Sequence, residues 1–294
     1  MLLTNHHNLP ETFINVINRP SYSRGKAQIS VTEVLNSPRI VMLKSRYWDV
    51  LEQDAADMVW SLFGTAVHNI LEHGKGENHV VEERLFTEFE GWRMSGAIDL
   101  QEIFEDGIVI NDYKVTGAWA VMNEKRDWML QLNMYAWLVE RVKKQKVKEV
   151  NIIAIVRDWN RRDAATRDGY PNAPIVTIPV KLMPFEEREA MIKERLEQHS
   201  EAQFCDMTGE ELPLCTPEDM WEKPTTYALK KEGNVRAKSV HKSQEEAVSA
   251  MEKLKSPKGY FVEVRPSDRT RCASFCPVSN HCSQYKTYLE SKAE

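Results

Sequence analysis

Asp112 and Lys114 lie two positions apart at the end of an apolar run, in the segment "VINDYKVTG" of residues 109–117. Side chains alternate along a β-strand, so a carboxylate and an ammonium group at this spacing share one face. Asp99 ends a similar run, "GAIDL", one predicted strand earlier, and the turn signal Asp106–Gly107 lies between the two. We therefore expect a hairpin that brings Asp99 and Asp112 together, with Lys114 beside them.

Two converging carboxylates suit a hard divalent cation such as Mg²⁺ or Mn²⁺. Lys114 could then polarise an attacking water or stabilise the negative charge that develops on a phosphate. The alternative is two unrelated surface aspartates near turns, with Lys114 as a salt-bridge partner.

Other groups of suitable chemistry precede this hairpin. His68, in "GTAVHNILE", lies on a predicted helix and could complete a three-ligand site, since imidazole binds Mn²⁺-like metals. Its alternative role is that of a hydrogen-bonded core histidine. "VVEERLF" adds Glu82 or Glu83 as a further carboxylate, and the alternative is an exposed acidic pair.

Gln131 and Tyr135, in "QLNMY", are spaced i and i+4 on a helix predicted after the D-x-K strand. That spacing places both on one helix face. An amide and a phenol there could bind a phosphate or a base edge, although most of this helix has the composition of a packed element.

Periodicity predicts the elements that position these groups. Apolar residues recur at helical spacing in 55–76, where glycines end the pattern, and Ser30 with Glu33 forms a capping-box signal for an earlier helix. Short strands, helices and a further strand follow, in the order strands 79–89, 92–104 and 107–114, helix 124–144, strand 150–159 and helix 183–204. This order predicts an α/β core with a mixed central sheet flanked by helices.

The pattern changes towards the C-terminus. "YALKKEGNVRAKSVH", "SQEEAVSAMEKLK" and "GYFVEVRP" read as a strand pair, a helix and a strand. We predict a first domain over residues 1–204 and a cysteine-containing region over 205–294, with a ββαβ module at about 221–266.

The composition is that of an ordinary globular protein. The 294 residues are 42% hydrophobic and 28% charged, no apolar run is long enough to cross a membrane, and the N-terminus lacks the features of a signal peptide, so we expect a cytoplasmic protein. The net charge of −5 gives no global electrostatic case for nucleic-acid binding. Local patches such as 221–271, with twelve Lys/Arg against seven Asp/Glu, must carry that case or be solvated faces.

Five cysteines occur, and three of them, Cys272, Cys276 and Cys282, fall within "RCASFCPVSNHC". An odd number in a chain without a secretion signal argues against a disulfide framework. Their density suggests a metal site, and the alternative is unlinked thiols.

Taken in order, these motifs resemble the PD-(D/E)XK nucleases of the RecB-like branch, which includes the AddB nuclease domain, CRISPR-associated RecB-like exonucleases and stand-alone viral enzymes. The motifs are His68 in "GTAVHNILE", Glu82 in "EERLF", Asp99 in "GAIDL", Asp112-x-Lys114 in "NDYKVTG" and Gln131-x3-Tyr135 in "QLNMYAWL". The resemblance covers roughly residues 61–140.

The resemblance implies a restriction-endonuclease-like core that cuts DNA with Mg²⁺ or Mn²⁺. By this analogy His68, Asp99 and Asp112 are metal ligands, Lys114 is the catalytic lysine and Glu82 is a supporting acid. Gln131 and Tyr135 would contact DNA or brace the site.

Many RecB-like nucleases also hold a four-cysteine iron–sulfur cluster, with one cysteine upstream of the histidine motif and three near the C-terminus. This chain has the three but no cysteine before His68, and Cys215 is the natural replacement. Four thiolates suit a four-iron cluster or Zn²⁺ equally.

The leading functional hypothesis is metal-dependent hydrolysis of DNA, single-stranded or at duplex ends, by an exonuclease. Trp119 and Arg126, just past the D-x-K strand, are candidates for stacking on bases and contacting phosphates, although such tryptophans also serve as core anchors. A non-catalytic nucleic-acid-binding or assembly subunit and an RNA-directed nuclease are the alternatives. A homo-oligomer or a helicase or recombination partner is compatible with each of them.

Overall fold

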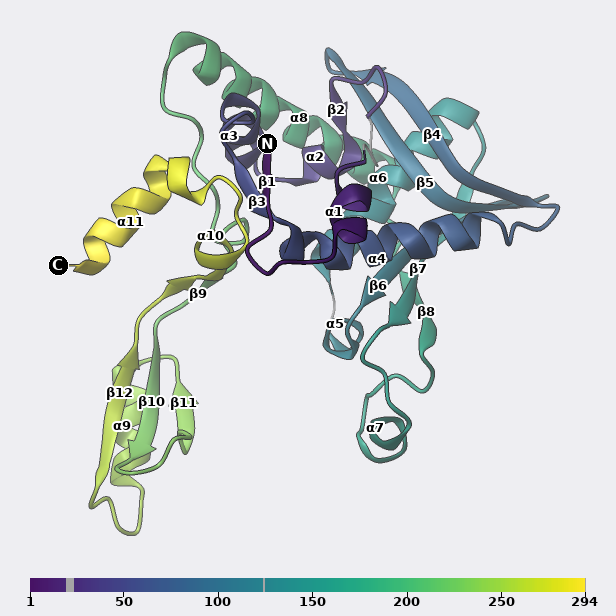
Figure 1. Cartoon of the computed structure of the whole chain (residues 1–294). Coiled ribbons are helices and arrows are strands. Elements are labelled where there is room, and N and C mark those ends of the chain that lie inside the picture. Colours follow the sequence, from purple (N-terminus) through teal and green to yellow (C-terminus); the bar gives the residue numbers. More distant parts are fainter. Residues whose placement is uncertain (20–23, 124, 294) are drawn as a thin grey trace. The chain divides into compact units, whose positions relative to one another are not determined.

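The computed structural model describes residues 1–19, 24–123 and 125–293 (Figure 1). It divides into two compact units, Met1–Pro213 and Leu214–Glu294. Position 204, where the sequence analysis places the boundary, lies inside a long helix, and the observed division follows after that helix has ended.

The first unit contains eight helices and eight strands among the described residues. The helices are α1 (Glu11–Ile17), α2 (Val31–Leu35), α3 (Pro38–Arg46), α4 (Ala55–Glu72), α5 (Ala118–Met122), α6 (Arg126–Lys143), α7 (Arg161–Thr166) and α8 (Phe185–Thr208). The strands are β1 (Leu2–Thr4), β2 (Ile29–Ser30), β3 (Glu52–Asp54), β4 (His79–Phe89), β5 (Trp92–Phe104), β6 (Gly107–Thr116), β7 (Val147–Val156) and β8 (Ile175–Val180).

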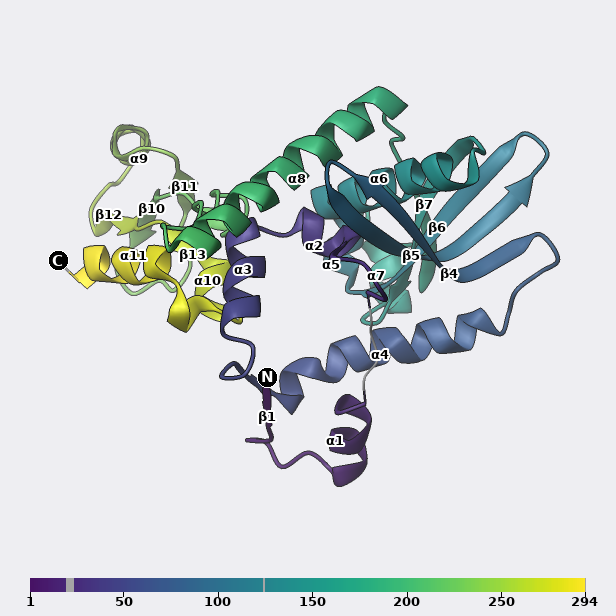
Figure 2. The same cartoon turned by 90° about the horizontal axis from the view of Figure 1, so that it is seen from above.

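Six of these strands form one mixed sheet in the order β2-β5-β6-β7-β8, with β4 paired to β5. The pairs β4–β5, β5–β6 and β7–β8 are antiparallel, whereas β2–β5 and β6–β7 are parallel. Figure 2 shows the sheet between α6 and α8 on one side and α4 on the other. The predicted α/β class with a mixed sheet flanked by helices is therefore confirmed.

Several elements form for reasons that are visible locally. Ser30 and Glu33 make the capping box at the start of α2 that the sequence predicts. Gly107, with φ +144°, turns the chain between β5 and β6, and a Cβ there would lie 2.8 Å from the carbonyl oxygen of Lys146. Glu124, where the helix after β6 is predicted to begin, lies outside the described residues, and α6 is described from Arg126.

The core lies between the sheet and α6. Eight consecutive residues of α6, from Leu132 to Val139, are buried, and Trp137 is fully enclosed. The strands contribute apolar side chains such as Ile98, Ile110 and Ile152 to the same cluster. This burial fixes α6 against the sheet and so fixes where its polar residues point.

The second unit holds a small three-stranded sheet in the order β11-β10-β12, with one helix. Its elements are β9 (Glu222–Lys223), β10 (Thr226–Lys231), β11 (Ser239–His241), α9 (Gln244–Glu252), β12 (Tyr260–Arg265), β13 (Asp268–Arg269), α10 (Thr270–Ser274), a 3₁₀ turn (Ser279–His281) and α11 (Ser283–Ala293). The order β10, β11, α9, β12 is the predicted ββαβ module.

Candidate active site

The two aspartates of the predicted hairpin lie where β5 and β6 separate. Backbone pairing of these strands runs from Phe104–Gly107 to Leu100–Asn111 and stops there. Beyond that point β6 continues along β7, while β5 pairs with β2 at Met94 and Ser95. Asp99 and Asp112 are the next residues on each strand, so the fork in the sheet holds both carboxylates.

Glu82 of β4 lies between the pairs Val81–Leu100 and Glu83–Ile98, which places it opposite Asp99 on β5. Its φ of +49° is in the left-handed region, which a glutamate rarely adopts and which is strained. Glu83 instead binds Lys143, with 2.5 Å between Oε2 and Nζ, and accepts a hydrogen bond from Gln101. Of the two candidates, Glu82 is therefore the one at the fork.

His68, on α4, reaches the fork with both ring nitrogens. Its Nδ1 lies 3.2 Å from Glu82 Oε1 and 3.6 Å from Asp99 Oδ1, and its Nε2 lies 3.3 Å from the Tyr113 carbonyl oxygen. Ligand atoms of His68, Glu82 and Asp99 all lie within 4.8 Å of one another. Among the described residues, this is the one group of its kind.

The electrostatics of the group reflect its burial. Desolvation, followed by the nearby Asp112 carboxylate, raises the pKa of Asp99 to about 7. The hydrogen bond with Glu82, together with the charge on Asp99, raises the pKa of His68. In the absence of a cation, the fork therefore favours a proton on its imidazole and works against full ionisation of its carboxylates.

Asp112 is not part of the close group, which differs from the ligand set implied by the resemblance. Its side chain is 2% exposed, and Lys114 Nζ lies 2.6 Å from its Oδ2. That buried oxygen receives no hydrogen bond, because the contact with Lys114 lacks hydrogen-bond geometry. The ammonium group therefore neutralises Asp112 in this arrangement and leaves one oxygen with an unused acceptor site.

A chain of hydrogen bonds continues from Lys114 into the core. Lys114 Nζ donates to Gln131 Oε1 at 3.1 Å, and Gln131 Nε2 donates to Tyr135 Oη at 2.9 Å. Tyr135 is 5% exposed, and its ring would lie 3.0 Å from a Cβ at Gly96. Tyr135 is thus positioned to brace Gln131, and contact of these two residues with DNA stays a prediction.

Trp119 and Arg126 lie on the surface past β6. The Trp119 side chain on α5 is 64% exposed, with Lys125 Nζ 4.3 Å from its ring centroid. Arg126, the first residue of α6, is also exposed. Neither residue is a core anchor, which was the alternative considered for Trp119.

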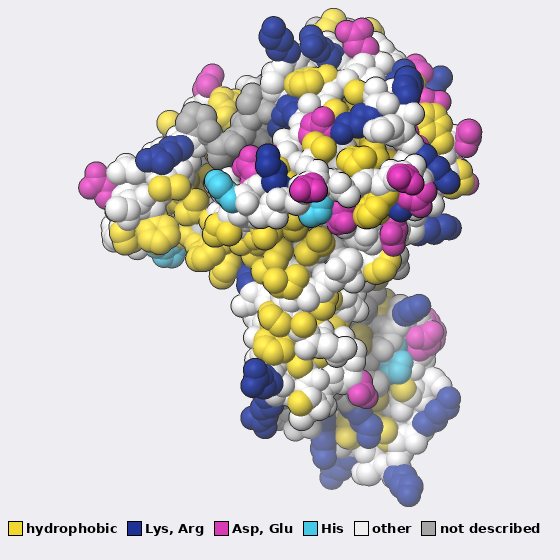
Figure 3. All heavy atoms as spheres, turned by 90° about the vertical axis from the view of Figure 1, so that its right-hand side faces the viewer, with side chains coloured by type: hydrophobic (Ala, Val, Ile, Leu, Met, Phe, Trp, Pro, Cys, Tyr) yellow, Lys and Arg dark blue, Asp and Glu magenta, His cyan; other side chains and the backbone are white. Residues whose placement is uncertain are grey.

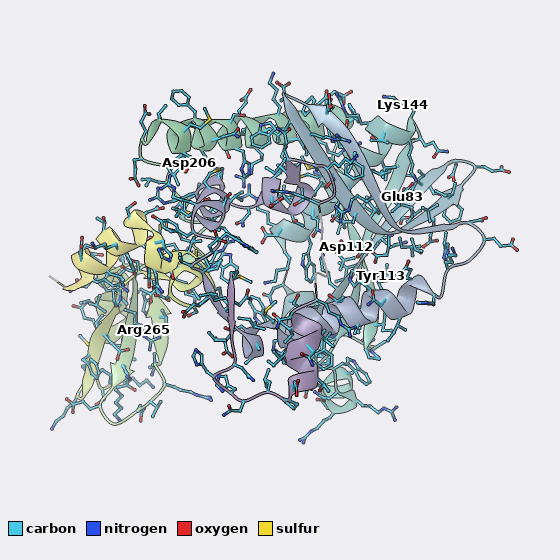
Figure 4. All side chains as sticks on the ribbon, turned by 45° about the horizontal axis from the view of Figure 1, so that its top comes forward. Glu83, Asp112, Tyr113, Lys144, Asp206 and Arg265 are labelled. Atoms are coloured by element: carbon cyan, nitrogen blue, oxygen red, sulfur yellow. The ribbon has the colours of Figure 1, made fainter. Side chains whose placement is uncertain are left out.

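Tyr113 has a role at the fork that sequence reasoning missed. Its backbone N–H donates to Asp99 Oδ2 at 2.8 Å, and its carbonyl oxygen contacts His68. Figure 4 shows Asp112 and Tyr113 side by side on β6. Backbone groups leave no residue-type signal, so only the D-x-K spacing around Tyr113 pointed to this position.

These residues fit a hard divalent cation. One imidazole nitrogen and two carboxylates already converge, a third carboxylate is adjacent, and its buried Oδ2 lacks a hydrogen bond. Oxygen ligands with one imidazole are a donor set for Mg²⁺ or Mn²⁺.

The cysteines of the second unit gather around its C-terminal helices. Cys215 is 8% exposed, and its backbone N–H and carbonyl both bond the Gln284 side chain, two residues past Cys282. Burial and then the charges of Cys276 and Cys282 raise the pKa of Cys272 to about 11. Within the described part of the chain, no three of these sulfur atoms lie within 4.8 Å of one another.

Fold and site together place acidic groups and a lysine at a fork in a mixed sheet, with a histidine from an adjacent helix. The sequence model of the PD-(D/E)XK nuclease superfamily matches residues 42–283, most of the chain. The chain belongs to this superfamily. No curated protein matches its sequence.

A comparison with solved structures finds matches of low sequence identity, two of which follow. A protein designated SSO0001 is 15% identical, with a TM-score of 0.43, over 68% of this chain and 91% of that one. A protein of Eubacterium rectale, provisionally named an exonuclease, is 13% identical, with a TM-score of 0.33, over 64% of this chain and 71% of that one. Separately, none of the described helices is long and apolar enough to cross a membrane.

Proposed function

We propose that this protein is a metal-dependent DNA nuclease, acting as an exonuclease of the RecB-like branch. The observation that carries the proposal is the convergence of His68, Glu82 and Asp99 at the fork, with Asp112 and Lys114 adjacent. The order of the motifs along the chain supports the branch. A phosphodiester could use both groups, because a cation and an ammonium group would each offset negative charge on it.

His68, Glu82 and Asp99, with Asp112 beside them, would hold Mg²⁺ or Mn²⁺. When bound there, the cation supplies positive charge that lowers the pKa of water and offsets the charge of the scissile phosphate. The Tyr113 carbonyl accepts a hydrogen bond from His68 Nε2 and so orients the ring, while Nδ1, which lies 3.2 Å from Glu82 Oε1, would exchange that contact for the cation.

Lys114 supplies a positive charge beside the site without being a ligand. Its Nζ is held between Asp112 Oδ2 and Gln131 Oε1, and its side chain is 24% exposed, so a phosphate can approach it. An ammonium group in this position stabilises negative charge on the phosphate oxygens as attack proceeds. Tyr135 acts through Gln131 and is a positioning residue for this lysine.

The cysteine site remains a prediction: Cys215, Cys272, Cys276 and Cys282 hold either a four-iron cluster or Zn²⁺. A single Zn²⁺ binds sulfur at about 2.3 Å and so brings its thiolates close together. A four-iron cluster is likewise held by four thiolates, and it differs from Zn²⁺ in absorbing visible light. Visible absorption of the anaerobically purified protein tests this assignment.

End-labelled DNA and RNA of one sequence, incubated with Mn²⁺, test the main proposal. We expect DNA to be shortened from an end, and we expect Glu82→Gln and Lys114→Met to abolish cutting. Glu83→Gln is the matched control, because this neighbouring acid binds Lys143 away from the fork. Cutting of RNA alone identifies an RNA-directed nuclease, DNA binding without cutting identifies a binding subunit, and full activity in Lys114→Met refutes the site.

A further inference from the structure

Helix α4, which carries His68, is unusually exposed for an apolar helix. Of its 18 residues, only Ala55 is buried. Trp60, Phe63 and Ile70 are 57%, 50% and 70% exposed. Figure 3 shows a broad field of hydrophobic side chains on the face of the molecule that includes this helix. A large apolar patch of this kind beside a polar site marks a place where something binds.

Trp60 carries a cation on its ring. The Arg157 guanidinium carbon lies 4.0 Å from the Trp60 ring centroid, and the Phe63 ring is tilted at 36° to that of Trp60, with 5.8 Å between centroids. An exposed indole paired with an arginine offers a face for stacking and a charge for a phosphate.

Arg157, which contacts Trp60, is hydrogen-bonded to β6, the strand that carries Asp112 and Lys114. Its backbone N–H donates to the carbonyl oxygen of Thr116, the last residue of β6, at 2.9 Å. Lys114 is two residues earlier on the same strand. Along α4, eight residues separate Trp60 from His68, or about 12 Å at 1.5 Å per residue. Trp60 therefore lies about 12 Å from His68 along α4. Arg157 lies beside Trp60, over its ring.

A second aromatic–cation pair borders the same end of β6. Trp119, with Lys125 over its ring, follows Ala118, whose N–H donates to Asp158 Oδ1 at 2.7 Å, next to Arg157 in the chain. Gly117 permits this close approach, because a Cβ there would lie 3.1 Å from Asp158 Oδ2. Two exposed tryptophans, each with its own cation, thus flank the end of the strand that carries Asp112 and Lys114.

We propose that Trp60 and Arg157 bind a single-stranded segment of the DNA substrate next to the fork, with an unpaired base stacked on the indole and a backbone phosphate at the guanidinium. This inference rests on the proposed function. Stacking on a side chain requires an unpaired base, since in a duplex each base face is covered by its neighbours. The charge of Arg157 complements a phosphate, whereas an apolar protein partner would leave that charge without a use.

Trp60→Leu and Trp60→Tyr separate aromatic stacking from simple apolar contact. Binding of a labelled single strand and of the matching duplex is measured by fluorescence anisotropy with Ca²⁺, and KM and kcat are measured with Mn²⁺. We expect Trp60→Leu to weaken single-strand binding and raise KM about tenfold, with kcat and duplex binding little changed, while Trp60→Tyr stays close to wild type. Arg157→Gln should weaken single-strand binding and reduce its salt dependence.

Trp48→Leu is the matched control, since Trp48 is 46% exposed with Lys44 over its ring but lies after α3. Equal effects of Trp48→Leu and Trp60→Leu, or equal loss of single-strand and duplex binding, overturn the inference. The inference is also overturned if Trp60→Leu binds the single strand as the wild type does. It is overturned as well if the wild type self-associates and Trp60→Leu does not, because the patch is then an interface between copies. If the wild type cuts no polynucleotide, the proposed function fails, and the Ca²⁺ binding measurements still decide the role of Trp60.

Discussion

The ion pair of Lys114 and Asp112 makes a quantitative test of the site in the absence of cations. Asp112 is 2% exposed, and Lys114 is its nearest positive charge, at 2.6 Å. Removing one partner of a buried pair costs about 3–5 kcal/mol, because it leaves an uncompensated charge. Lys114 is 24% exposed, so we expect Lys114→Met to lower the free energy of unfolding by about 3 kcal/mol, the lower end of that range.

Urea denaturation in EDTA at pH 8, followed by tryptophan fluorescence, measures this loss. All tryptophans but Trp221 precede residue 214, so the signal reports on the first unit. Adding Asp112→Asn to Lys114→Met should restore most of the stability, since the uncompensated charge is then gone. Mn²⁺ should stabilise Lys114→Met more than wild type, because the cation takes over the role of the ammonium group.

Lys148→Met is the control for this experiment. Lys148 pairs with Asp106 at 2.5 Å on the same sheet, but Asp106 is 72% exposed. Such surface pairs contribute about 0–1 kcal/mol. If Lys114→Met costs no more than Lys148→Met, or if the double variant is no more stable than Lys114→Met alone, then Asp112 is not a buried charge that requires a cation.

Three further predictions follow from the same unit. Gly96→Ala should lower stability by about 1–3 kcal/mol, because its Cβ would lie 2.9–3.1 Å from three side chains. One of these is Tyr135, which braces Lys114 through Gln131, so kcat should also fall. Denaturation and cleavage assays measure the two effects. In EDTA, stability should fall as pH rises from about 4 to 7. The reason is the raised pKa of Asp99: over this range the folded state holds a proton that the unfolded chain has released. Asp99→Asn should flatten this part of a series of denaturation measurements against pH. Burial lowers the pKa of His199, so its contribution should be present above pH 6.5 and decline below it, and His199→Gln should lessen that acid-side loss in a thermal-unfolding series.

The strands around the hairpin could be predicted from the sequence because turn residues, Glu90–Gly91 and Asp106–Gly107, separate their apolar runs. Strands 79–89 and 92–104 have the bounds of β4 and β5. The two-residue β2 and the strand β8 were not predicted. β2 is too short to show a period, and it exists because it pairs with Met94 and Ser95 of β5. Such elements depend on tertiary pairing and leave no local pattern.

In the candidate site, too, some features could be predicted from the sequence and others could not. The hairpin was readable from Asp106–Gly107, but its register was not. The observed pair Phe104–Gly107 makes Glu105 and Asp106 the loop, and this register places Asp99 and Asp112 next to each other at the fork. The left-handed backbone of Glu82 was not readable, since nothing in a glutamate signals a positive φ. Glu83 turns away because it meets Lys143, a partner sixty positions along the chain.

At the fork, the groups that we propose for catalysis also destabilise the metal-free protein. Where β5 and β6 separate, Glu82 is held at a strained φ, burial raises the pKa of Asp99, and Asp112 Oδ2 lacks a hydrogen bond. Each feature lowers the stability of the metal-free protein, and each is tolerated because the surrounding core fixes the backbone. A divalent cation would offset the two electrostatic penalties together, since it attracts Asp99 and Asp112 at once. Stability gained on adding Mn²⁺, and lost again in Asp99→Asn, is therefore the direct physical signature of this site.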